Sequence, residues 1–116
     1  MRQKKRSWTS TFAAALRGIG EAIKEERNMR VHVAAAAGVA VYIAVTRPEK
    51  VELFFLLLAI FLVLITEMIN TALERTVDLA TDEYRELARQ AKDAAAGAVL
   101  LAAVFAVLVG IITVFF

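Results

Sequence analysis

Three apolar segments constrain what this chain can fold into more than any other feature. Residues 94–116 and 53–65 contain no charged side chain, and neither do residues 31–45 apart from His32. About 20 apolar residues let a helix cross the roughly 30 Å hydrocarbon core of a bilayer. A chain of 116 residues that is 59% hydrophobic is too apolar for a soluble domain, whose small interior cannot bury that much surface. The sequence therefore predicts an all-α membrane protein with three transmembrane helices.

The remaining segments fit one membrane domain that covers residues 1–116. Residues 1–7 form a basic tail, and residues 8–27 have the apolar spacing of an amphipathic helix lying in the membrane interface. A helix packed within the bundle is the alternative for 8–27. We expect transmembrane helices at 29–46, at 51–72 with an extension to about 80, and at 94–116. The first helix is expected to run on into the first span, and the polar stretch 81–93 to turn the chain back.

The positive charges predict the orientation. Every Lys and Arg except Arg47 and Lys50 falls within 1–30 or 74–93, which three spans place on the same side of the membrane. The positive-inside rule makes that side cytoplasmic. We therefore assign the basic start to topology and to contact with anionic lipid, rather than to nucleic acid. The chain has no cysteine, which excludes disulfides and thiolate chemistry.

One polar stripe follows the apolar run 53–65. Asn70, Glu74 and Asp78 all lie within about 60° of Glu67 around a helix that turns about 100° per residue. Carboxylates at the depth of Glu67 are costly in a membrane and usually functional. The stripe is typical of a catalytic base with cation ligands, because Mg²⁺ prefers carboxylate oxygens. A structural polar network between helices, or a proton or ion path, is the alternative.

Other charged residues lie at the same membrane level. Glu26 could complete a cation site, although Glu25 and Glu26 also fit a solvated helix face. Lys92 could bind phosphate as a point charge, or extend to the membrane edge. We interpret His32 as a histidine at headgroup level or packed between helices. The five glycines form neither a phosphate loop nor a dinucleotide fingerprint, so any nucleotide chemistry needs another device.

Three blocks of sequence carry a resemblance. From Glu67 the pattern is E-x-x-N-T-x-x-E-x-x-x-D, followed after a loop by A-K-D-x-x-A-G-A-V from Ala91. Upstream stand Thr11-Phe12-x-x-Ala15-x-x-Gly18 and Glu25-Glu26-Arg27-Asn28-x-Arg30-x-His32. In this order the blocks resemble the bacterial integral-membrane diacylglycerol kinase family, which includes the undecaprenol kinases. The resemblance covers roughly residues 10–112.

The resemblance implies an ATP- and Mg²⁺-dependent lipid kinase of the bacterial cytoplasmic membrane that works as a homotrimer with shared active sites. It implies that Glu67 is the general base, helped by Asn70, and that Glu26 and Glu74 bind the metal ions. The positions that match nucleotide contacts are Glu26, Glu74, Glu83, Tyr84, Arg85, Lys92 and Asp93. The lipid substrate would meet Glu67 and Ala96. Asp78 matches a position of the motif without an assigned role.

The lipid is not fixed by this pattern. Arg30-Val31-His32 and Ala95-Ala96-Gly97-Ala98 are more similar to the undecaprenol kinase branch, so we favour undecaprenol over diacylglycerol. From the residues alone, a small protein that translocates ions or protons through Glu67 remains the competing hypothesis.

Overall fold

The chain forms four helices in a computed structural model that describes residues 7–116. They are α1 (Trp8–Glu25), α2 (Arg27–Thr46), α3 (Lys50–Ala80) and α4 (Glu86–Phe115). Of these, α2, α3 and α4 are long and apolar enough to cross a membrane. The predicted all-α membrane architecture is therefore confirmed. The basic tail predicted at 1–7 lies outside the described residues, except for Ser7.

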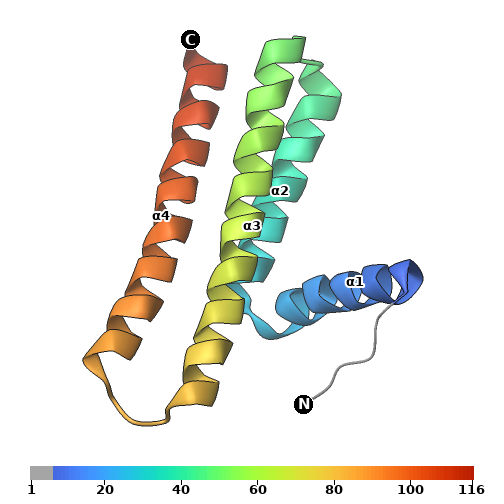
Figure 1. Cartoon of the computed structure of the whole chain (residues 1–116). Helices are drawn as coiled ribbons and strands as arrows, with labels where there is room; N and C mark the ends of the chain where they lie inside the picture. The colour runs from blue at the N-terminus through green and yellow to red at the C-terminus, as the bar shows by residue number, and fades with distance from the viewer. Residues whose placement is uncertain (1–6) are drawn as a thin grey trace.

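Helix α3 is the centre of the bundle. Figure 1 shows α2, α3 and α4 running alongside one another, with α1 extending sideways from the lower part of the bundle. Residues of α2 and α4 both pack against the core residues Leu56 and Ala59 of α3. With 31 residues, α3 is about 46 Å long, which exceeds the roughly 30 Å hydrocarbon core. Its last turns therefore project beyond the apolar layer.

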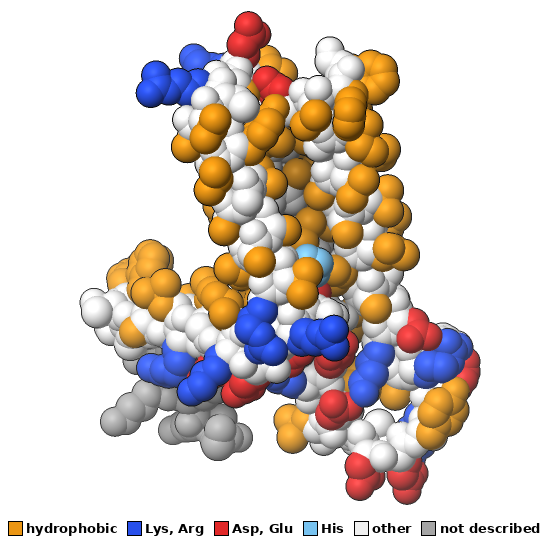
Figure 2. All heavy atoms as spheres, turned by 180° about the vertical axis from the view of Figure 1, so that it is seen from behind, with side chains coloured by type: hydrophobic (Ala, Val, Ile, Leu, Met, Phe, Trp, Pro, Cys, Tyr) orange, Lys and Arg blue, Asp and Glu red, His pale blue; other side chains and the backbone are white. Residues whose placement is uncertain are grey.

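The buried side of α3 is a single face. Its buried residues recur every three or four positions, as Leu56, Ala59, Val63, Glu67 and Asn70, followed by Thr71. Most large hydrophobic side chains of the other faces are exposed. Figure 2 shows them over the middle of the bundle, with charged side chains gathered at its two ends. A membrane protein has this pattern, because its outer surface faces lipid rather than water.

The first two helices are separate, which corrects the expectation of one continuous helix. Glu26 has extended backbone angles and lies between α1 and α2. The Arg30 guanidinium donates hydrogen bonds to the carbonyl oxygens of Ile23 (3.2 Å) and Lys24 (2.8 Å). These carbonyls belong to the last turn of α1, which has no helical partners of its own, so Arg30 stabilises the break.

Helix α1 has the arrangement of a surface helix. Only Ala22 is buried, whereas Trp8, Phe12 and Leu16 are exposed. Figure 2 shows hydrophobic side chains along one side of α1 and basic side chains along the other. This separation of apolar and basic sides fits a helix in the membrane interface better than one packed in the bundle.

The sequence predicted the α2–α3 connection more accurately than the α3–α4 connection. Thr46 ends α2 and Lys50 starts α3, close to the expected loop. By contrast, α4 starts at Glu86, two turns before the predicted span at 94–116, and the connection from α3 is correspondingly short. Arg89 makes ion pairs with Glu86 and Asp93 at i−3 and i+4, which support these first polar turns as helix.

Candidate active site

The polar stripe continues the buried face of α3 toward the charged end of the bundle. Glu67 is only 2% exposed, and Asn70 is also buried. Glu74, one turn further, is half-buried, and the Asp78 side chain is 65% exposed. The stripe therefore runs from the protein interior to the surface within a few helical turns. Because exposure increases along the stripe, its buried end can contact a molecule in the membrane while its exposed end contacts a molecule from water.

Glu67 faces the histidine of the neighbouring helix. The Oε2 atom of Glu67 lies 3.5 Å from Nε2 of His32 on α2. The carboxylates of Glu26 and Glu74 lie close enough for their negative charges to act on Glu67. Sequence reasoning placed His32 in a packed or headgroup position and missed this contact. The spacing of residues along the chain cannot predict this contact, because His32 and Glu67 belong to different helices.

Asn70 lies between Glu67 and Glu74 along the stripe and contacts Glu74. Its side-chain Nδ2 donates a hydrogen bond to Oε1 of Glu74 at 3.2 Å, which orients that carboxylate. The Asn70 Oδ1 atom and the Thr71 hydroxyl are buried without a hydrogen-bond partner. Buried polar atoms are normally paired, so unpaired ones in a native protein need an explanation. Here Oδ1 of Asn70 is available to accept a hydrogen bond from a ligand.

Glu26 reaches the stripe because the chain breaks there. Arg75 of α3 lies 2.8 Å from Glu25 and 3.6 Å from Glu26, and so ties the break to α3. Within residues 7–116, no group of three or more Asp, Glu, His or Cys side chains is arranged to hold a metal ion. Mg²⁺ bound to phosphates needs only one or two protein carboxylates. Glu26 and Glu74 fit that role, whereas a metal site made of protein ligands alone does not fit.

A separate cavity of about 510 Å³ lies where α3 meets α4. In its wall, the Oδ1 atom of Asp78 on α3 lies 2.5 Å from Nζ of Lys92 on α4, and the two side chains form an ion pair. Glu74 also acts on Lys92 through its charge and so connects this cavity to the stripe. Most of the predicted nucleotide contacts are gathered here: the lining includes Asp78, Glu83, Tyr84, Arg85, Arg89, Lys92 and Asp93. Glu26, Glu67, Asn70, Glu74 and Ala96 are not part of the lining, and Ala96 is exposed on α4.

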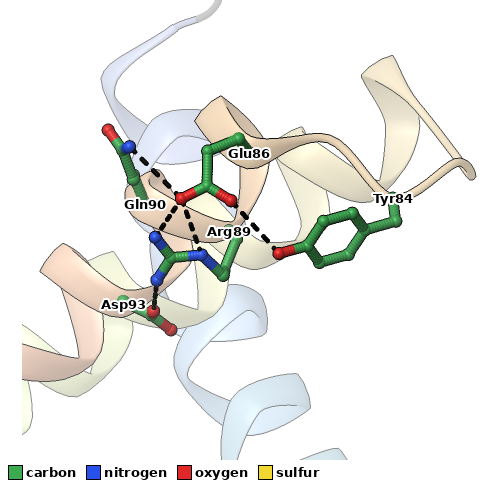
Figure 3. Close-up of polar contacts among 5 residues, drawn as sticks. All are labelled: Tyr84, Glu86, Arg89, Gln90 and Asp93. Carbon is green, nitrogen blue, oxygen red and sulfur yellow. Dashed lines mark hydrogen bonds and ion pairs between the residues drawn. The ribbon is translucent and has the colours of Figure 1, made fainter.

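Arg89 organises the wall of this cavity, and sequence reasoning missed it. Its guanidinium donates hydrogen bonds to Glu86 and, at 2.7 Å, to Asp93, and Tyr84 donates to Glu86 (Figure 3). Hydrogen bonds from Arg89 and Gln90 hold the pKa of Glu86 below its usual range. The i, i+3 and i+7 spacing of Glu86, Arg89 and Asp93 on one helix could have revealed the network, once the helix was placed correctly.

Comparison with known proteins decides the family. Residues 13–114 match the family described as prokaryotic diacylglycerol kinase. The chain belongs to this family. The resemblance seen in the sequence is thereby confirmed, and the chain is a lipid kinase.

Curated relatives carry two names. The undecaprenol kinase of Bacillus subtilis (strain 168) is 41% identical over 102 residues, covering 88% of this kinase and 83% of the relative. The diacylglycerol kinase of Synechocystis is 44% identical, covering 86% of this kinase and 58% of the relative. The diacylglycerol kinase of Escherichia coli (strain K12) is 34% identical, covering 86% and 88%. A kinase requires a phosphate donor, so a nucleotide co-substrate follows from the family.

Proposed function

We propose that this kinase transfers the γ-phosphate of ATP, with Mg²⁺, to the hydroxyl group of a membrane lipid alcohol at the cytoplasmic surface. The observation that carries the proposal is the placement of Glu67, a carboxylate 2% exposed where the apolar part of the bundle gives way to its charged end. A lipid hydroxyl meets the protein at this depth, while its chain stays in the bilayer. ATP reaches the exposed end of the same stripe from water.

Glu67 would act as the general base. Phosphoryl transfer depends mainly on positioning and on neutralising charge. A carboxylate that accepts the proton of the lipid hydroxyl makes that oxygen a better nucleophile toward the γ-phosphorus. Asn70 would help position the phosphate or the base, because its buried Oδ1 atom is unpaired and its Nδ2 atom holds Glu74.

Glu26 and Glu74 would hold the metal ion. Both lie near Glu67, and the hydrogen bond from Asn70 fixes the orientation of the Glu74 carboxylate. Bound Mg²⁺ neutralises charge on the transferring phosphate. Because both carboxylates lie near Glu67, phosphates held there through the metal would also lie near the base.

The cavity between α3 and α4 would bind the nucleotide. Lys92 offers a positive charge to the phosphates, and Arg85 a second one at the α3–α4 connection. Tyr84 is exposed and offers an aromatic surface to the base. Glu83 and Asp93 would accept hydrogen bonds from the nucleotide, with Asp93 held in place by Arg89.

The assembly and orientation belong to the same proposal. The sequence resemblance implies a homotrimer with shared sites, and the many exposed hydrophobic side chains of α2, α3 and α4 leave apolar surface for neighbouring copies as well as lipid. Helix α1, the last turns of α3 and the α3–α4 connection lie toward the same end of the bundle (Figure 1). Their positive charges favour the cytoplasm of a bacterial inner membrane for that end.

Undecaprenol is the lipid we favour, with diacylglycerol as the alternative. The support is the sequence around Arg30–His32 and Ala95–Ala98, which is more similar to the undecaprenol kinase branch. The test is a side-by-side kinase assay on the two lipids in mixed micelles. A higher kcat/KM for diacylglycerol contradicts the preference and leaves the lipid kinase activity itself intact.

Glu67→Gln tests the base directly. The substitution keeps the size of the side chain and removes its ability to take up a proton, so kcat should fall about 10²- to 10⁴-fold. The matched control is Glu21→Gln, at an exposed position on α1. Wild-type kcat in Glu67→Gln refutes the assignment. Proton or ion flux through liposomes without ATP consumption would instead favour the competing translocation hypothesis.

A further inference from the structure

Glu67 and His32 form a contact that the proposed reaction does not yet use. Their facing atoms, Oε2 and Nε2, lie 3.5 Å apart, and the two side chains differ in exposure. Glu67 is 2% exposed, whereas the His32 side chain is 20% exposed. His32 is also the only histidine in the chain. The pair therefore links a carboxylate sealed in the bundle to a group that reaches its surface.

The chemistry of the reaction leaves a proton to be removed. In each turnover the O–H bond of the lipid breaks, an O–P bond forms, and the bond from the γ-phosphorus to the bridging oxygen of ATP breaks. Near pH 7 and above, the products carry one proton fewer than the reactants, because phosphate monoesters have a second pKa of about 6. A buried Glu67 that has accepted this proton must lose it before it can act again.

We infer that His32 is a positioning residue that relays this proton from Glu67 to water. The proton on Glu67 passes to Nε2 of a neutral imidazole that carries its own proton on Nδ1, and the Nδ1 proton then leaves to water. Proton exchange with water returns the ring to the Nδ1-protonated form before the next turnover. Histidine suits this role, since its ordinary pKa of about 6.5 lets it gain and lose a proton near neutral pH. The inference rests on the proposed role of Glu67 as the base.

Three charged residues lie around the pair. The negative charges of Glu26, beside the start of α2, and of Glu74, on α3, act on Glu67 and so surround the same place. On α2 itself, the Arg30 guanidinium is engaged by the carbonyl oxygens of Ile23 and Lys24. The partial exposure of the His32 side chain, at 20%, gives the proton an exit from the bundle.

Two substitutions of His32 separate a relay from a structural contact. His32→Gln keeps a polar group beside Glu67 but cannot carry a proton, so kcat should fall about tenfold or more while the KM values for ATP and lipid change little. His32→Ala opens space next to Ala35 and Ala36, which line the same small cavity. Added imidazole should therefore restore kcat in His32→Ala, and the restored kcat should rise with the concentration of neutral imidazole.

The controls decide the interpretation. Pyrazole has the size of imidazole but is too weak a base to carry the proton, so it should not restore kcat in His32→Ala. Imidazole should not restore activity in Glu67→Gln, which lacks the first proton acceptor. Wild-type kcat in His32→Gln, or equal effects of pyrazole and imidazole, overturns the relay. If Glu67→Gln is itself fully active, the proposed function fails instead, so the two failures are distinguishable.

Discussion

Two adjacent glutamates give the sharpest test of the metal assignment. Glu25 ends α1 and pairs with Arg75 at 2.8 Å, with side chains that are 58% and 47% exposed. Glu26 has extended backbone angles, is less exposed, and lies where its charge acts on Glu67. Of these two adjacent residues, only Glu26 should therefore bind Mg²⁺. Glu26→Gln and Glu25→Gln make the same chemical change one residue apart, so each controls for the other.

The expected magnitudes differ clearly. A unit-charge pair about 4 Å apart near a protein surface interacts by about 4 kcal/mol, and dehydration of the carboxylate offsets much of this. A net loss of about 1.4 to 2.8 kcal/mol raises the KM for Mg²⁺ about 10- to 100-fold in Glu26→Gln. Exposed ion pairs such as Glu25–Arg75 contribute about 0.2 to 1 kcal/mol, so Glu25→Gln should change this KM at most about fivefold.

The assay is the rate of lipid phosphorylation at saturating ATP and lipid while free Mg²⁺ is varied. Raising Mg²⁺ should restore the activity of Glu26→Gln toward that of the wild type, because the lost ligand weakens metal binding. Equal shifts in the two variants would refute the distinction drawn from the helix break. An unchanged KM for Mg²⁺ in Glu26→Gln would remove Glu26 from the metal site.

Two further predictions concern contacts between helices. Lys92→Gln should raise the KM for ATP about tenfold or more, because a charged phosphate partner is lost, whereas Asp78→Asn should leave it equal or lower, because Lys92 is released from its ion pair. A rise in Asp78→Asn equal to that in Lys92→Gln would contradict the view that Asp78 competes with phosphate for Lys92. Arg30→Gln removes the hydrogen bonds that hold the end of α1, so backbone amides of residues 22–26 should exchange hydrogen faster, with Arg27→Gln as the control. Unchanged exchange in Arg30→Gln would show that the break is stable without this contact.

The sequence by itself determined the helices and the stripe. The segments 31–45, 53–65 and 94–116 contain no Lys, Arg, Asp or Glu and do not alternate between polar and apolar residues as barrel strands do. In a bilayer such segments form helices, which satisfy their own backbone hydrogen bonds. The recurrence of Glu67, Asn70 and Glu74 at helical spacing placed them on one face, and the structure shows this face as the buried side of α3, with Glu67 and Asn70 both buried. Both features depend on residues close together in the chain, where helix geometry alone relates them.

Only the tertiary structure decided what meets the stripe from other helices. The break at Glu26 occurs without proline or glycine and is stabilised by Arg30 from the following helix. The His32–Glu67 contact and the Asp78–Lys92 ion pair each join two helices. Local periodicity does not encode such pairs, because they depend on the rotation of each helix about its axis and on its offset along its neighbour. Those two quantities are set by packing across the whole bundle, and they turn a row of polar residues on α3 into a candidate active site.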